Sequence, residues 1–169
     1  MQILLTGGTG FLGSALCALL LNEGHQLTII SRKPQVIFTR YGGKVRGLRR
    51  LTDLTVNDYF DVVINLAGEG IADQPWTQQR KLALYTSRVN LTDELVDWMR
   101  RVKKRPQVLL SASAIGWYGN QSHEILDEDS HPHDEYTHQL CKDWEKSALA
   151  AEQLGIRVCV LRTGVVLGR

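Results

Sequence analysis

Short apolar runs alternate along the chain with longer segments whose apolar residues recur at helical spacing. The runs are nearly continuous, which is typical of parallel strands that are buried on both faces. In the first helical segment, Leu12, Leu16, Leu19 and Leu20 share one face. The pattern predicts strands at 2–6, 26–31, 44–48, 61–66, 107–111 and 156–161, and helices at 11–23, 76–103 and 135–154.

Strands that alternate with helices predict an α/β fold, a Rossmann-like doubly wound parallel sheet. Right-handed crossovers would give the strand order 3-2-1-4-5-6. Such sheets bind ligands at the carboxyl ends of the strands, near the switch between strands one and four. The segments that follow 2–6 and 61–66 should therefore meet at one crevice.

The turn after the first strand is rich in glycine. We expect Gly8 to permit a tight turn, Gly10 to let the backbone approach a phosphate, and Gly13 to let the next helix pack closely. A helix start also offers unpaired N–H groups to an anion. An ordinary strand–turn–helix connection is the alternative, but the place of this motif in the chain favours a dinucleotide site. The cofactor-binding candidates here are Gly7, Thr9, Gly10, Phe11, Leu12 and Gly13.

The second strand ends in Ser31-Arg32-Lys33, where an NAD site usually carries an acidic residue for the ribose 2′-hydroxyl. A guanidinium matches a 2′-phosphate in charge and geometry, and the Ser31 hydroxyl can add a hydrogen bond. We therefore predict NADP(H) over NAD(H), with Ser31 and Arg32 at the phosphate. The alternative is that Arg32 is a solvated loop residue.

Composition changes this picture little. The 169 residues suffice for one domain with a sizeable core, and 43% hydrophobic and 22% charged residues are ordinary for a soluble globular protein. A net charge of +2 does not suggest a nucleic-acid surface. Cys17, Cys141 and Cys159 form no CxxC, so we expect neither a disulfide framework nor a metal site, and we expect Cys17 and Cys159 in the core. Without a targeting or membrane-spanning segment, a cytoplasmic protein is predicted.

Several segments together resemble the short-chain dehydrogenase/reductase superfamily, in its extended, epimerase-like branch. They are residues 6–13, 65–68 and 110–114. Further segments resemble the YfcH-type epimerase-family proteins: residues 31–34, 65–69, 111–119 and 162–168, with Trp76, Lys81, Ser87, Arg88, Trp144 and Glu145. The resemblance spans essentially the whole chain, and it implies a nicotinamide cofactor across the strand ends.

The resemblance also implies further cofactor-binding residues. The backbone after the fourth strand would face the adenosine and pyrophosphate, although Asn65 could instead bond local backbone. Arg88 stands where extended relatives often carry an asparagine, so it could pair with a cofactor phosphate or a substrate anion. The alternative is a surface arginine near Asp93 or Glu94. The candidates are Leu66, Ala67, Gly68, Arg88 and Ser111.

Redox members of the superfamily use a Tyr-x-x-x-Lys pair on the helix after the fifth strand, and a nearby Ser or Thr hydroxyl. Ser113 fits the hydroxyl as a contact for a substrate oxygen. The pair is missing, because Leu140 follows Tyr136 at the fourth position and His138 precedes Lys142 at that spacing. Ser113 and Tyr136 are therefore the catalytic candidates, with Tyr136 as a second choice for the proton donor.

Two functions stay open. One is an NADP(H)-binding, epimerase-like oxidoreductase domain that acts on an unknown small molecule, a carbonyl, hydroxyl or nucleotide-sugar-like compound. The other is a non-catalytic NADP-binding or sensor protein. Extended members are usually longer, so we expect residues 1–169 to be the NADP-binding, N-terminal part of a longer protein, with the substrate domain absent from this chain. Surface exposed beyond the last strand could then support a homodimer.

Overall fold

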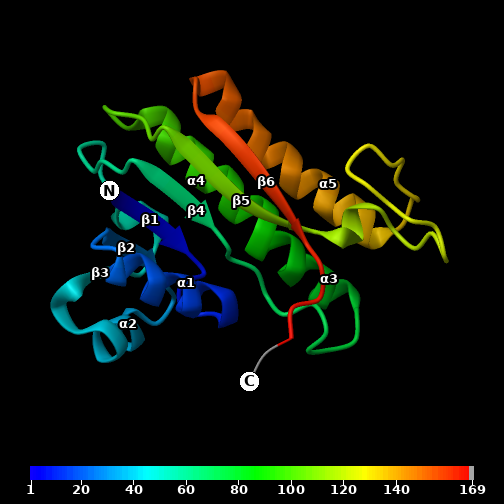
Figure 1. Ribbon diagram of the computed structural model, residues 1–169, viewed down its shortest axis with the longest axis horizontal. Helices are drawn as coiled ribbons and strands as arrows, with labels where there is room; N and C mark the ends of the chain where they lie inside the picture. The colour runs from blue at the N-terminus through cyan, green and yellow to red at the C-terminus, as the bar shows by residue number, and fades with distance from the viewer. Residues whose placement is uncertain (168–169) are drawn as a thin grey trace.

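The computed structural model describes residues 1–167, which form a six-stranded parallel sheet with helices on both faces (Figure 1). The strand order is β3-β2-β1-β4-β5-β6, so the predicted doubly wound topology is confirmed. Gly168, the last residue of the matching segment 162–168, lies outside the described residues. The strands are β1 (Gln2–Thr6), β2 (Gln26–Ile30), β3 (Val45–Leu48), β4 (Val62–Asn65), β5 (Val108–Ala114) and β6 (Arg157–Thr163).

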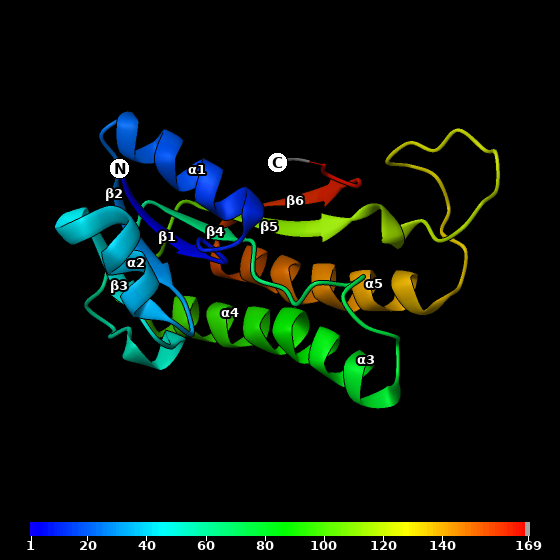
Figure 2. The ribbon, with the colours of Figure 1, turned by 90° about the horizontal axis from the view of Figure 1, so that it is seen from below.

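Helices sandwich the sheet in two groups (Figure 2). One group lies over β1, β2 and β3 on one face of the sheet, and the other group lies on the opposite face. The first group is α1 (Phe11–Asn22) and α2 (Pro34–Tyr41); the second is α3 (Gln78–Tyr85), α4 (Leu91–Arg101) and α5 (Tyr136–Leu149).

Alternation along the strands supplies a separate core to each group of helices. Ile3 and Leu5 of β1 pack with Cys17 of α1 and Ile37 of α2. Leu4, between them, faces the opposite way and joins the core beneath α4 and α5. In doubly wound sheets of this kind, ligands bind outside the carboxyl ends of the strands.

The predicted element boundaries needed several corrections. The pattern of apolar residues did not predict α2, although Pro34 at its first position is a typical helix start. The predicted helix 76–103 is α3 and α4 joined by a π-helical turn, Thr86–Asn90. The predicted helix 135–154 is α5 followed by a 3-10 turn, Ala150–Leu154. β5 continues to Ala114, so Ser113 lies within the strand.

The first helix was expected to bury its leucine-rich face, but only part of that face is buried. Leu12 and Leu19 are 42% and 55% exposed, whereas Gly13 and Cys17 are buried. Small residues face the sheet because α1 packs close to it, and Leu16 and Leu20 flank the contact. Cys159, expected in the core, is only half-buried, while Cys17 is buried as expected.

Candidate functional site

The glycine turn that links β1 to α1 is closed by backbone contacts. Gly7 has φ +72°, and a Cβ there would lie 2.6 Å from the Leu66 carbonyl oxygen. Gly7 therefore takes the left-handed conformation of the turn. At Gly8, which was expected to permit a tight turn, a Cβ would lie 2.6 Å from Leu5 Cδ2. A Cβ on Gly13 would lie 2.3 Å from the Gly7 carbonyl oxygen, so α1 rests directly against the turn. The predicted close packing at Gly13 is thus present.

The N-terminus of α1 is open on its outer side. Gly10 is the N-cap, no side chain caps the helix, and a Cβ on Gly10 would meet only the Gly7 carbonyl oxygen, at 3.2 Å. The first-turn amides, including those of Phe11, Leu12 and Gly13, have no intrahelical acceptor. Such amides can donate to a phosphate. The arrangement fits a dinucleotide pyrophosphate.

A buried polar network lies beneath the strand ends. The Thr6 hydroxyl donates to Asn65 Oδ1 (2.6 Å), and Asn65 Nδ2 donates to the hydroxyls of Thr92 (2.8 Å) and Ser111 (3.4 Å). Trp144 Nε1 also donates to the Thr92 hydroxyl, at 3.1 Å. Asn65 therefore bonds side chains of β1, β5 and α4, and the alternative of a bond to local backbone is wrong. Ser111 is buried within this network.

The loop after β4 passes over the glycine turn. The Leu66 N–H donates to the Thr6 carbonyl (3.2 Å), and the Ala67 N–H donates to the Thr6 hydroxyl (3.3 Å). A Cβ on Gly68 would lie 3.0 Å from Arg88 Cζ, so the guanidinium packs against the loop backbone. The structure thus brings the candidates Leu66, Ala67 and Gly68 to the glycine turn.

Arg88 lies in the π-helical turn and is partly buried. Its guanidinium donates to the carbonyls of Glu69 (2.8 Å) and Leu84 (3.3 Å), and burial lowers its pKa. Within residues 1–167 it forms no ion pair, so the alternative of a surface arginine beside Asp93 or Glu94 is wrong. A π-turn often marks a functional site. This one places the Arg88 guanidinium against the loop that follows β4.

Arg32 contacts a carboxylate that the sequence analysis did not assign to the site. Arg32 Nη1 lies 2.6 Å from Glu69 Oε1, and its side chain is otherwise 87% exposed. The hydrogen bond from Arg32, together with the charges of Arg32 and Arg80, lowers the pKa of Glu69. The hydroxyls of Thr9 and Ser31 lie 3.5 Å apart next to this pair. Glu69 was missed because Arg32 and Glu69 are 37 positions apart and only the fold brings them together. Arg80 lies in α3 and contacts Glu69 across the loop that follows β4.

Both catalytic candidates already have hydrogen-bond partners. The buried Ser113 hydroxyl donates to Glu145 Oε1 at 2.6 Å, and Arg162 holds both oxygens of that carboxylate at 2.9 Å. The Tyr136 hydroxyl donates to the Lys81 carbonyl at 3.2 Å, and burial raises the pKa of Tyr136. The structure does not bring Ser113 and Tyr136 to one common acceptor.

The face of α5 that looks onto the end of β5 carries neither tyrosine nor lysine. A Cβ on Gly116 would lie 3.1 Å from Thr137 Cβ and 3.6 Å from Cys141 Sγ. Thr137 and Cys141 are four positions apart and so share this helix face. Burial raises the pKa of the Cys141 thiol. The Tyr-x-x-x-Lys pair is therefore absent from this helix face. The lysine ammonium that lies near Tyr136 is that of Lys81 on α3, 4.6 Å from the centroid of the tyrosine ring.

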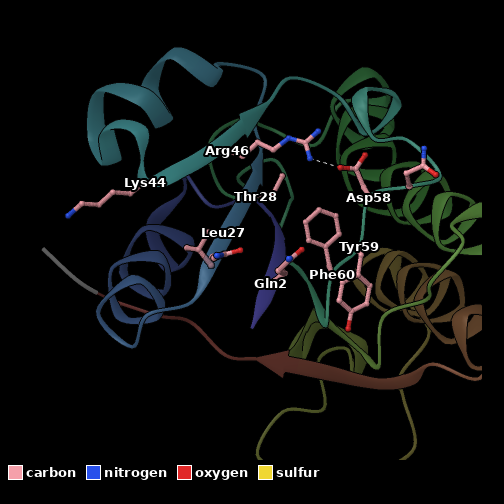
Figure 3. A pocket seen from close by; sticks show the side chains of 10 residues that line it. Gln2, Leu27, Thr28, Lys44, Arg46, Asp58, Tyr59 and Phe60 are labelled. Carbon is pink, nitrogen blue, oxygen red and sulfur yellow. Dashed lines mark hydrogen bonds and ion pairs between the residues drawn. The ribbon is translucent and has the colours of Figure 1, made fainter.

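Two pockets lie outside this crevice. One, of about 630 Å³, opens at the amino ends of the strands, where Arg46 pairs with Asp58 beside Gln2 and Thr28 (Figure 3). This pocket and the glycine turn therefore lie at opposite ends of the strands. The other, of about 530 Å³, lies at β6 next to Tyr118 and Arg162.

Residues 1–167 contain neither a membrane-spanning helix nor a cluster of metal ligands. No helix there combines the length and apolar character of a membrane span. No group of three or more metal-ligating side chains comes together in the same part of the chain.

Comparisons with known proteins agree with the geometry. The chain is 36% identical over 170 residues to the epimerase family protein YfhF of Bacillus subtilis, covering 99% of this chain and 56% of that protein. It spans about half the length of the curated relatives it matches.

Two solved structures have the same fold at 30% identity or more. The human epimerase family protein SDR39U1, crystallised with NADPH, matches with a TM-score of 0.82 and 30% identity, over 100% of this chain and 55% of that one. A nucleoside-diphosphate sugar epimerase from Corynebacterium glutamicum matches with a TM-score of 0.81 and 31% identity, over 99% and 34%. Residues 3–169 match the NAD dependent epimerase/dehydratase family, and the chain belongs to this family.

Proposed function

We propose that the chain binds NADP(H) at the carboxyl edge of its sheet and serves an oxidoreductase of the epimerase type. The observation that carries the proposal is the junction of three elements: the open N-terminus of α1, the loop after β4, and Arg32 at the end of β2. The human relative crystallised with NADPH supports the choice of dinucleotide. The dinucleotide, when bound, would supply a hydride donor or acceptor.

Each cofactor contact assigned from the sequence has a role in this proposal. Amides of the first turn of α1 would bind the pyrophosphate, with the loop after β4 opposite them. Arg32 and Ser31 would bind the 2′-phosphate. Arg88 would hold the loop in place, and its charge favours an anion at the crevice. The residues are Gly7, Thr9, Gly10, Phe11, Leu12, Gly13, Ser31, Arg32, Leu66, Ala67, Gly68 and Arg88, with Ser111 as a buried support.

Titration calorimetry with NADP⁺ and NAD⁺ tests the cofactor. We expect NADP⁺ to bind about tenfold more tightly or better, because a hydrogen bond to a charged group contributes roughly 1.5–3 kcal/mol. Arg32→Ala should bring the two dissociation constants together. Arg101→Ala, which removes an exposed arginine from the last turn of α4, should not. Equal affinities in the wild-type chain would contradict the preference for NADP(H).

The substrate is proposed to be a small carbonyl or hydroxyl compound, or a nucleotide-sugar-like one. Support comes from the pocket at β6, which adjoins the Ser113–Glu145–Arg162 group at the same edge of the sheet. Oxidation of NADPH against a carbonyl panel tests this. If Ser113 contacts the reacting oxygen, Ser113→Ala should lower turnover by about 100-fold, the size of a typical acid–base contribution. Unchanged turnover would remove Ser113 from that role.

A binding or sensor protein without turnover is the second candidate. It is favoured by the engaged hydroxyls of Ser113 and Tyr136 and by Thr137 and Cys141 on the catalytic face of α5. It predicts tight NADP(H) binding without consumption of NADPH on any carbonyl.

A further inference from the structure

The ion pair between Arg32 and Glu69 crosses the mouth of the crevice. Arg32 follows β2 and Glu69 follows β4, and these two strands flank β1 on either side. A contact between the ends of β2 and β4 must therefore pass over the carboxyl end of β1, where the glycine turn begins. The 2.6 Å contact lies on the side of the crevice at which Arg32 would meet a 2′-phosphate.

The two partners of this pair are held very differently. The Glu69 N–H donates to the Ser87 hydroxyl (3.1 Å), and its carbonyl accepts from Arg88 (2.8 Å). Its second carboxylate oxygen lies 3.5 Å from Arg80 Nη1. Its side chain is 26% exposed, against 87% for Arg32. Glu69 is thus the fixed partner, and Arg32 is the partner that can leave.

We propose that Glu69 is a specificity-determining residue that competes with the cofactor's 2′-phosphate for Arg32. The inference rests on the proposed NADP(H) function of the same site. A phosphomonoester carries about −1.5 to −2 charges at neutral pH and accepts a guanidinium in a bidentate fashion, so it displaces a single carboxylate oxygen. After Arg32 has moved to the phosphate, Arg80 still pairs with Glu69, so the carboxylate is not left without a cationic partner. NAD lacks the phosphate and leaves the Arg32–Glu69 pair in place.

This competition predicts that removing the Glu69 charge tightens the binding of NADP⁺ and leaves the binding of NAD⁺ unchanged. Glu69→Gln keeps the backbone contacts and the side-chain volume but frees Arg32. Because an exposed ion pair contributes little, NADP⁺ should bind roughly twofold to fivefold more tightly, with NAD⁺ affinity unchanged within about twofold. In an Arg32→Ala background the same substitution should have no effect, since the competed group is gone.

Titration calorimetry on wild type, Glu69→Gln, Arg32→Ala and the double variant measures this directly. Asp73→Asn is the matched control, because Asp73 lies in the same loop, 3.9 Å from Arg80, and contacts Arg80 but not Arg32. It should leave both affinities unchanged. A ligand-free readout is the titration of the Glu69 carboxyl group by ¹³C NMR. Arg32→Ala should raise the pKa of Glu69, because it removes the hydrogen bond that lowers this pKa.

The outcomes separate this inference from the function on which it rests. Weaker NADP⁺ binding by Glu69→Gln would mean that Glu69 positions Arg32 for the phosphate, and it would overturn the competition. The competition would also be overturned if Glu69→Gln tightened NADP⁺ binding equally in the Arg32→Ala background. The same holds if Arg32→Ala left the pKa of Glu69 unchanged. If the wild-type chain binds neither dinucleotide, the proposed function falls and this inference falls with it.

Discussion

Two carboxylates pair with arginines at the carboxyl ends of the strands. Glu69 pairs with Arg32 and Arg80, and Glu145 pairs with Arg162. Ser31 and Arg32 could be placed from sequence because the end of a strand is a local feature. The carboxylates could not, since Arg32 and Glu69 are 37 positions apart and only the sheet brings them together. The same holds for Ser113, whose hydroxyl donates to a helix residue 32 positions away.

Arg162→Leu should destabilise the protein by about 3 kcal/mol, the cost of leaving a buried carboxylate without its ion-pair partner. Glu145 is 8% exposed and would keep only the Ser113 hydrogen bond. Chemical denaturation measures the loss. Arg157→Leu, on the exposed side of the same strand, is the control and should change stability by about 0.5 kcal/mol or less. Equal effects at both positions would show that the Glu145–Arg162 pair does not stabilise the fold.

At the scale of elements, the site depends on how α1 and the α3–α4 helix meet the strand ends. The glycine spacing predicted where α1 begins and that it packs closely. It did not predict which glycine is left-handed, because Gly7 and Gly8 differ only in their contacts with Leu66 and with the β1 and β2 side chains. The π-turn at Thr86–Asn90 was also missed, since one extra residue in a turn hardly disturbs a helical apolar pattern.

Gly13→Ala should separate α1 from the turn and destabilise the fold by about 3 kcal/mol, at the upper end for overpacking. The added methyl would meet backbone atoms, which cannot rotate away as a side chain can. NADP⁺ affinity should fall with it. Gly43→Ala is the control, because a Cβ there meets nothing within 4 Å. Thermal unfolding and calorimetry report both effects, and a stable Gly13→Ala variant with normal affinity would disprove the close contact.

At the scale of the whole molecule, the sheet order places β2, β1 and β4 side by side and so makes one crevice from three separate segments. The alternating pattern and the handedness of crossovers were sufficient to predict this order. The chemistry at the far end of the crevice was not predictable in the same way. It depends on which face of α5 meets β5, and that face carries Thr137 and Cys141.

Because a ligand that binds only the folded state stabilises it, NADP⁺ should raise the melting temperature more than NAD⁺ does. At 100 times its dissociation constant, NADP⁺ adds about 2.7 kcal/mol, or roughly 5–10 °C for a chain of this size. A tenfold weaker NAD⁺ at the same concentration adds about 1.4 kcal/mol. Differential scanning fluorimetry gives both values. Equal shifts would argue against recognition of the 2′-phosphate.

The central claim is that Arg32 binds the 2′-phosphate of NADP(H), and ³¹P NMR of bound NADP⁺ observes that group directly. A free phosphomonoester titrates with a pKa of about 6. A bound guanidinium favours the dianion, so the 2′-phosphate bound to the wild-type chain should titrate at clearly lower pH, and in Arg32→Ala it should titrate as in free NADP⁺. A resonance that titrates as in free NADP⁺ on the saturated wild-type chain would contradict the account.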